Sequence, residues 1–464
     1  MRGGRYLLLS ALAVGGCTLG PDYERPELET PASYIQPIQE GESFANTPWW
    51  ELFEDPALQT LVETALAEYQ DLGIAIARIE EFRAVLGLTR SEQFPTVDIT
   101  ASGSPTDPSG NSFPGNIVDD FADNYRLSGD VFWELDFFGR LRRSTEAARG
   151  ELLAAEESRR SVTISLIANV ASTYMLLRDL DAQLEIARRT EATRTDSLGI
   201  IQARFDKGTV PLVDVNQAEI ELAVAIAAVA TAERAVVQTE NSLSILLGRN
   251  PGPIVRGVAL DQQSLPPDVP VGLPSELLQR RPDVLASEAS LAAQTARIGV
   301  AEALRWPSIS LTGSLGFESQ ELSDMFDDGS DFWSVGGNIF APLINSGAGR
   351  ARVDAEIART EQALLSYEQT VQRAFAEVED ALVAVRTYKS EHEARSLQVT
   401  AARSAAFLSR ARYDGGVTSY LEVLDSERSL FSAELSESQT LRLYINSIIE
   451  LYKALGGGWV PKEP

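Results

Sequence analysis

The chain repeats itself at long range. Residues 203–215 (ARFDKGTVPLVDV) return at 411–423 (ARYDGGVTSYLEV), a displacement of 411 − 203 = 208 positions. Upstream, Asp71 pairs with Asp283 at a displacement of 283 − 71 = 212, so the first copy carries about four extra residues. A period near 200 is much longer than the roughly 20 to 50 residues of solenoid repeats. It indicates a duplicated domain whose halves bury one face against each other.

Composition removes several classes of function. The formal net charge is −27, and binding to nucleic acid draws on clustered Lys and Arg, so no nucleic-acid partner is expected. One His (His392), one Cys (Cys17) and three Met make a zinc site or a His-based catalytic triad improbable. The carboxylates lie mostly along polar helix faces without distinctive pairing. We therefore expect no enzyme, no metal site and no cofactor.

The N-terminus has the pattern of an export signal. Arg2 and Arg5 precede an apolar run at 6–14 that is too short to span a membrane, which predicts a signal peptide at 1–16. The segment LAVGGC that ends at Cys17 resembles a bacterial lipobox, which implies a covalent lipid at Cys17. Ordinary cleavage with an incidental cysteine is the alternative. A palmitate analogue should label the wild type and not Cys17→Ala, since an acylated N-terminus holds to a bilayer.

Four segments alternate between apolar and small polar residues, as strands do. We place these strands at 96–104, 124–135, 308–317 and 332–341, after a lipidated tether and equatorial segment at 17–60. Strands of roughly ten residues with aromatic residues at their ends are typical of transmembrane β-strands. A soluble pair of hairpins with one packed face is the alternative.

Helical periodicity covers most of the rest. A single helix is expected from about Leu58 to Phe94, and long helical hairpins at 140–248 and 348–456. The first repeat then spans 61–250 and the second 276–456, with an equatorial linker at 251–275 and a C-terminal tail at 457–464. Gly208 allows a left-handed helix end, and Pro211 is expected in the first turn of the return helix.

Four strands in one chain cannot close a barrel, and an open edge in lipid leaves backbone N–H and C=O groups unpaired. A barrel must therefore be shared between chains. Two chains would give eight strands and a filled interior, whereas three would give about twelve and a water-filled lumen. The small polar face favours three.

Several long motifs occur in the order of a known family. They are LPSELLQRRPD at 273–283, ARIGVA at 296–301, WPSISLTG at 306–313 and WELDFFGR at 133–140. They resemble the outer-membrane efflux lipoproteins of the OprM/NodT branch of the TolC family, over almost the whole chain. The resemblance implies a mainly α fold with a membrane β-barrel: a homotrimer whose 12-stranded barrel continues into an α-helical periplasmic barrel.

The same resemblance implies a passive duct in the outer membrane of a Gram-negative bacterium, in contact with membrane lipid. Its partners would be a periplasmic adaptor protein and an inner-membrane pump of the resistance-nodulation-division (RND) class. A protein-secretion duct of the same family and a periplasmic lipoprotein scaffold remain alternatives. The low count of Met argues weakly against metal export.

Family channels narrow at the tips of the helical hairpins, where acids ring the entrance. The matching positions here are Glu422 and Asp425, with Asp214 in the first copy, where Gln217 replaces the second acid. Alternatively, these acids are helix-start residues favoured by the helix dipole. The tips are expected to contact the adaptor or pump through Gly208, Thr209, Val210, Pro211, Gly415, Gly416, Val417 and Thr418.

Overall fold

The structure is a computed structural model that describes residues 18–28, 30–31, 33–35, 48–106, 122–265 and 274–457. The predicted signal peptide, Cys17 and the C-terminal tail beyond residue 457 lie outside the described residues. So do parts of the tether, of the first strand loop and of the linker.

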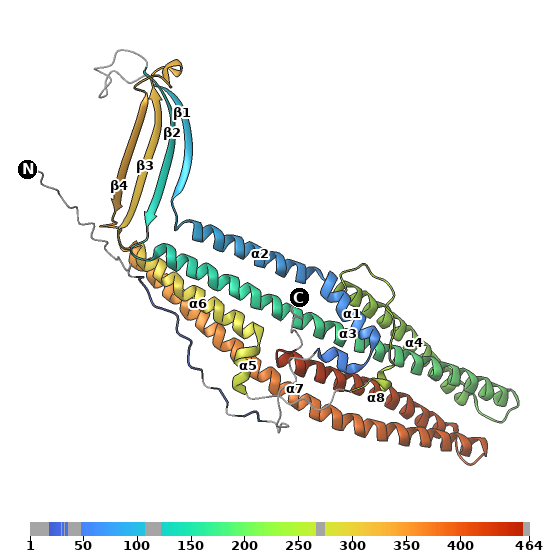
Figure 1. Ribbon diagram of the computed structural model, residues 1–464. Helices are drawn as coiled ribbons and strands as arrows, with labels where there is room; N and C mark the ends of the chain where they lie inside the picture. Colours follow the sequence, from blue (N-terminus) through green and yellow to red (C-terminus); the bar gives the residue numbers. More distant parts are fainter. Residues whose placement is uncertain are drawn as a thin grey trace, which may run out of the picture. The chain divides into compact units, whose positions relative to one another are not determined.

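The duplication is visible in the long helices (Figure 1). Helix α3 (Arg140–Asp206) and helix α7 (Ala348–Asp414) have 67 residues each, displaced by 348 − 140 = 208. Their return helices, α4 (Leu212–Leu246) and α8 (Tyr420–Ala454), have 35 residues each at the same displacement. Within the described ranges, no helix is both long and apolar enough to cross a membrane.

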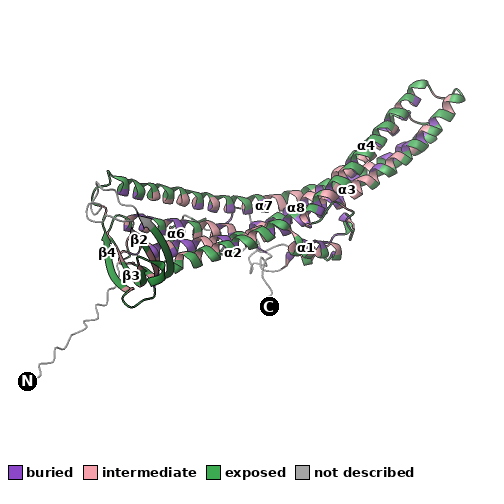
Figure 2. Ribbon diagram, turned by 90° about the horizontal axis from the view of Figure 1, so that it is seen from above, coloured by how far each residue is buried: buried purple, intermediate pink, exposed green. Residues whose placement is uncertain are grey.

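The four strands form one antiparallel sheet in the order β1-β2-β3-β4 (Figure 1). Their bounds are β1 Thr96–Thr106, β2 Ala122–Leu135, β3 Ser308–Ser319 and β4 Asp331–Phe340, within two residues of the predicted ends. In one chain β1 pairs only with β2, and β4 only with β3. Figure 2 shows the strands largely exposed, and in β4 nine of ten residues are exposed.

The helix expected from Leu58 to Phe94 is two helices, so that prediction was wrong. Helix α1 (Pro56–Glu68) ends at Tyr69, whose backbone is extended, and α2 (Gln70–Ser91) follows. The Gln70 side chain donates to the carbonyl of Gly248 at 3.0 Å. A Cβ on Gly248 would lie 2.2 Å from the Glu68 carbonyl oxygen. The contact with Gly248, just after α4, therefore fixes the bend, and neither Tyr69 nor Gln70 is a Pro or Gly that would predict it.

The remaining elements are short connectors and a second-repeat counterpart of α2. They are 3₁₀ turns η2 (Trp49–Phe53), η3 (Leu260–Gln262) and η4 (Leu322–Asp324), and helices α5 (Pro274–Arg280) and α6 (Pro282–Ala303).

The chain forms two compact units, and each draws on both repeats. Of the described residues, the first holds those within 1–27, 79–155 and 287–367, which include the sheet; the second holds those within 28–78, 156–286 and 368–464, which include both helical hairpin ends. Neither half of the duplication is therefore a compact unit by itself.

In the sheet-bearing unit, the segment after residue 17 is held by a buried arginine. Arg143 donates to the carbonyls of Leu19 and Gly20 at 3.0 and 3.1 Å and to the Asp22 carboxylate at 2.7 Å. Gly20 has φ +87, and a Cβ there would meet the Cα of Gly299 at 2.4 Å. The segment is thus packed too closely for a side chain at either glycine.

In the other unit, a buried carboxylate joins the connectors to α3. Asp55 accepts from the amides of Ala57 and Leu58, which caps α1, and from Tyr174 Oη on α3 at 2.9 Å. It also accepts from the Val258 amide and from Gln263 Nε2, at 3.1 and 2.9 Å. Around it lies an apolar core in which Trp49 stacks on Tyr452 of α8 with ring centroids 5.6 Å apart.

Candidate functional site at the hairpin tips

The two turns that join α3 to α4 and α7 to α8, here called the tip turns (207–211 and 415–419), share one backbone design. Gly208 and Gly416 have φ +72 and +71, the left-handed conformation that glycine adopts at least cost. The amides of Gly208 and Thr209 donate to the carbonyls of Phe205 and Arg204, at 2.7 and 3.0 Å. Gly416 and Val417 repeat both bonds, so each turn is a Schellman motif that satisfies the last helix carbonyls.

The prediction for Pro211 needs a correction, because it is the N-cap of α4 rather than a first-turn residue. Its extended backbone (φ −78, ψ 158) matches that of Ser419, the N-cap of α8. Most of the predicted tip residues are exposed, and Val210 and Thr418 are half-buried. The tip turns thus offer mainly backbone and small side chains to solvent.

A small apolar cluster lies directly beneath the tip turns. Tyr413 of α7 and Tyr420 of α8 lie 5.5 Å apart by ring centroids, and burial raises the pKa of Tyr420 to about 12. Arg204 of α3 lies over the Tyr413 ring at 4.7 Å, which joins the two hairpins. The buried members are Ile201, Val215, Ala218, Tyr413, Tyr420, Val423 and Leu424.

The three candidate acids lie on the first turns after the tip turns. Asp214 is half-buried in the first turn of α4, and burial raises the pKa of its carboxyl group. Glu422, in the first turn of α8, accepts from the Thr418 hydroxyl and pairs with Arg412 at 3.5 Å. Asp425 is exposed one turn further along α8. Two of the three acids are therefore available to a solvent-filled space.

A buried ion-pair network behind the tips was not predicted. Glu221 of α4 is 5% exposed and pairs with Arg194 of α3 at 3.0 Å and with Arg428 of α8 through a 2.6 Å hydrogen bond. Burial lowers the pKa of Arg194 despite its neighbouring carboxylates, Glu221 foremost. The triad links three helices from both hairpins, and removing Glu221 would leave the buried Arg194 without this carboxylate partner.

A second set of charges joins the same hairpins. Arg410 of α7 donates to Ser197 of α3 at 2.9 Å and pairs with Glu427 of α8 at 3.6 Å. Burial raises the pKa of Glu427, because loss of water disfavours its charged form. Arg204 reaches Asp414 at 3.2 Å. The tips of the two hairpins are thus held side by side by polar contacts as well as by the apolar cluster.

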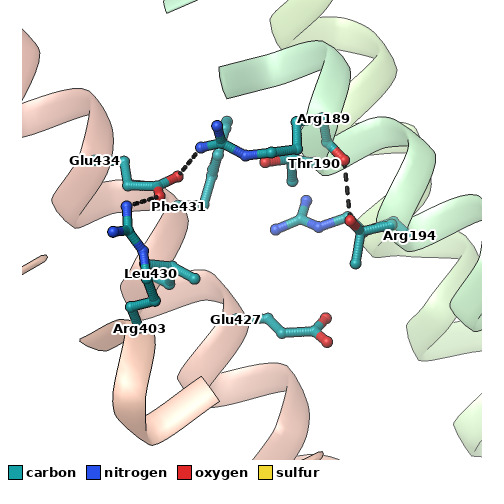
Figure 3. Close-up of a pocket in the computed structure, with 9 residues that line it drawn as sticks. Arg189, Thr190, Arg194, Arg403, Glu427, Leu430, Phe431 and Glu434 are labelled. Carbon is teal, nitrogen blue, oxygen red and sulfur yellow. Dashed lines mark hydrogen bonds and ion pairs between the residues drawn. The ribbon is translucent and has the colours of Figure 1, made fainter. Parts of the chain in front are cut away.

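Beyond this network the hairpins line an open pocket of about 360 Å³ (Figure 3). Arg189 and Arg403 approach the Glu434 carboxylate from opposite sides, at 2.6 and 3.1 Å (Figure 3). Arg194 lies over the Phe431 ring at 5.4 Å. The charges of Arg189, Arg403 and Glu434 are therefore already paired with one another across α3, α7 and α8.

One signal in the sequence could have revealed the buried network. Along α4 the buried positions Val215, Ala218, Glu221 and Ala225 follow steps of three and four, so Glu221 occupies a position expected to be apolar. A charge at such a position requires a partner. The partners themselves, Arg194 and Arg428, lie 27 and 207 positions away and could not be read from spacing.

The comparisons with known proteins decide the family. The model of the outer membrane efflux protein family matches this chain twice, at residues 61–249 and 273–457. The chain belongs to the outer membrane efflux protein family. The two matches are displaced by 273 − 61 = 212 at their starts and 457 − 249 = 208 at their ends, which are the displacements of the internal repeat.

Relatives of this efflux protein match over nearly their full length. The chain is 38% identical to the solvent efflux pump outer membrane protein SrpC of Pseudomonas putida, over 97% of both chains. It is 34% identical to the cation efflux system protein CusC of Escherichia coli K12, over 97% of this chain and 98% of that one. The solved outer-membrane channel OprN superposes with a TM-score of 0.88 at 33% identity, over 96% of this chain and all of OprN.

The predicted family, fold class and outer-membrane location are therefore confirmed. These relatives are efflux channel proteins rather than enzymes, and the family implies no cofactor. In the part of the chain that the structure describes, no group of three or more His, Cys, Asp or Glu could hold a metal ion.

Proposed function

We propose that three copies of this outer membrane efflux protein close one tube that conducts small molecules from a tripartite pump to the cell exterior. The single observation that carries the proposal is the sheet. It has four strands, two unpaired edges and one apolar and one polar face. In lipid, both edges require a partner strand, and the strand directions make β4 of one copy antiparallel to β1 of the next.

The number of copies follows from the polar face. Three copies of a four-stranded sheet give about twelve strands, enough for a lumen filled with water. The even-numbered positions of the strands carry mainly Ser, Thr, Asp and Asn, with Phe132, Phe332 and Phe340 among them, and such a lumen requires these polar side chains. Two copies would bring these polar side chains into a ring too small to hydrate them.

The membrane and partner contacts complete the proposal. A lipid on Cys17 would anchor the segment that Arg143 holds beside the start of α3. The tip turns, with the exposed Gly208, Thr209, Gly416 and Val417 and the half-buried Val210, would contact a periplasmic adaptor and an inner-membrane pump of the RND class. Glu422, Asp425 and Asp214 would form the constriction, since three copies of each would face one axis.

A deletion strain tests the function. Loss of the gene should raise the accumulation of a fluorescent drug several-fold, and the wild-type gene should restore efflux. The variant Gly208→Pro, which disrupts the first tip turn, should not restore efflux, because proline cannot adopt the φ of +72 found there. Blotting for equal amounts of protein in the outer membrane is the control.

Two outcomes would contradict this proposal. Unchanged drug accumulation together with a defect in secreting one protein would favour a protein-secretion duct. Purified trimers that give no ion conductance in bilayers would favour a scaffold whose strands form no pore.

A further inference from the structure

The polar face of the sheet carries its charges at defined levels, here called rungs, each made of residues directly opposite one another on neighbouring strands. One rung holds Asp98, Asp130 and Ser314. A second rung, two levels closer to the strand loops on the same face, holds Ser102, Arg126 and Glu318. Two carboxylates directly opposite each other oppose sheet formation. The pair Asp98 and Asp130 therefore indicates that this face borders a solvent-filled space and is not packed against protein.

Arg126 is the only Lys or Arg in the four strands. The polar face also carries Asp98, Asp130, Glu134 and Glu318, so its formal charge per chain is 1 − 4 = −3. Glu134 is engaged by Arg140 of α3 at 3.0 and 2.8 Å. Arg126 is thus the one positive charge among the strand residues of a face that is otherwise acidic.

The position of Arg126 is fixed on three strands. Its Nη2 donates to Ser314 Oγ at 3.0 Å, and its Nη1 lies 3.6 Å from Glu318 Oε2 on β3. Its guanidinium lies over the Phe332 ring of β4 at 4.4 Å. Ser314 in turn donates to Asp130 at 2.6 Å. These contacts tie the guanidinium to β3 and β4, and the side chain remains 36% exposed.

We propose that Arg126 sets the charge selectivity of the strand-lined part of the channel. The inference rests on the proposed function, which turns the polar face toward the lumen of a three-copy tube. Three guanidinium groups then neutralise the three Glu318 carboxylates on their own rung, close to the outer mouth, so that this rung is neutral while the deeper rung stays acidic. Without them, the strand-lined lumen would favour cations along its whole length.

The range of electrostatic forces decides how this is measured. A fixed charge acts over about 30 Å at about 0.01 M salt, but over only about 3 Å at about 1 M. The charge of Arg126 therefore affects ions throughout the wide lumen at low salt, but only ions next to the wall at high salt. In the proposed tube a permeating ion would also pass the tip acids, so the measurement uses a Glu422→Ala, Asp425→Ala background in which they are neutral.

The experiment records reversal potentials of purified trimers in bilayers under a KCl gradient. At about 0.01 M mean salt, Arg126→Gln should raise the permeability ratio of K⁺ to Cl⁻ about twofold or more, and the rise should vanish near 1 M. Glu318→Gln, which leaves the guanidinium without its carboxylate, should move the ratio the other way. Arg126→Lys should stay near the wild-type ratio. Ser334→Ala, on the same face, is the matched control.

The outcomes separate the two proposals. If the trimers conduct but Arg126→Gln and Glu318→Gln both match Ser334→Ala at low salt, the role of Arg126 is refuted and the channel proposal stands. If Arg126→Gln does not insert, the opposite shift in Glu318→Gln still decides. Wild-type trimers without any conductance would overturn the channel proposal and this inference with it.

Discussion

Replacing Asp55 by alanine should destabilise the hairpin-bearing unit by about 3 to 5 kcal/mol. Asp55 is fully buried and accepts five hydrogen bonds, from Ala57, Leu58, Tyr174, Val258 and Gln263. Alanine would leave these donors buried without an acceptor and would remove the N-cap of α1. The packing here is close, because a Cβ on Gly257 would meet Asp55 Oδ1 at 2.0 Å.

Hydrogen exchange measures this effect better than thermal melting, since large membrane assemblies unfold irreversibly. The amides of Leu58 and Val258 should exchange about 10² to 4 × 10³ times faster in Asp55→Ala, because 1.4 kcal/mol corresponds to about tenfold. Glu63→Ala, which removes an exposed carboxylate from the same helix, should exchange as the wild type does. Equal exchange in the two variants would refute the role of Asp55 as the junction of this core.

Neutralising the tip acids should open the narrow end of the tube. In Glu422→Ala with Asp425→Ala, single-channel conductance should rise about twofold or more and cation selectivity should fall. The reason is that like charges in a narrow ring attract cations and occupy the lumen, whereas alanine does neither. Bilayer recordings of purified trimers supply both quantities.

Arg412 provides the control for this variant. Glu422→Ala also frees Arg412, its ion-pair partner at 3.5 Å, and a free guanidinium could by itself reduce cation selectivity. Arg412→Gln separates the effects, because it should increase cation selectivity without enlarging the conductance. A double variant with wild-type conductance would exclude these acids from the constriction and leave them as helix-start residues.

The features that sequence predicted well are those with a local or repeated signal. The predicted strand ends lie within two residues of the observed ones, because alternation with a period of two indicates a sheet with two unlike faces. The helix end at Gly208 was predicted because glycine adopts a φ above zero at least cost, and Gly416 has the same conformation in the second copy. The repeat itself predicted that α3 and α7 have equal length.

The features that sequence missed depend on contacts between distant segments. The bend at Tyr69 is made by Gly248, 179 positions away, and the Arg194–Glu221–Arg428 triad joins three helices. Pro211 was placed one position too far into its helix, because proline fits both the N-cap and the first turn. From its local sequence Asp55 would be only a helix N-cap. Its hydrogen bonds with Tyr174, Val258 and Gln263 form only when the chain folds.

The most direct test of the three-copy tube is covalent closure of the strand edges. Directly opposed residues on antiparallel strands lie about 4.5 to 5.5 Å apart at Cα, which suits a disulfide. Ile99→Cys on β1 is combined in turn with Trp333→Cys, Val335→Cys or Gly337→Cys on β4, since all four positions share the apolar face. Each single cysteine variant is the control.

Oxidised outer membranes are then separated without reductant. The three-copy tube predicts that one of these pairs yields a covalent species of three chains and nothing larger, while single variants yield none. A ladder that continues beyond three chains, or the absence of cross-linking in all three pairs, would contradict the shared barrel.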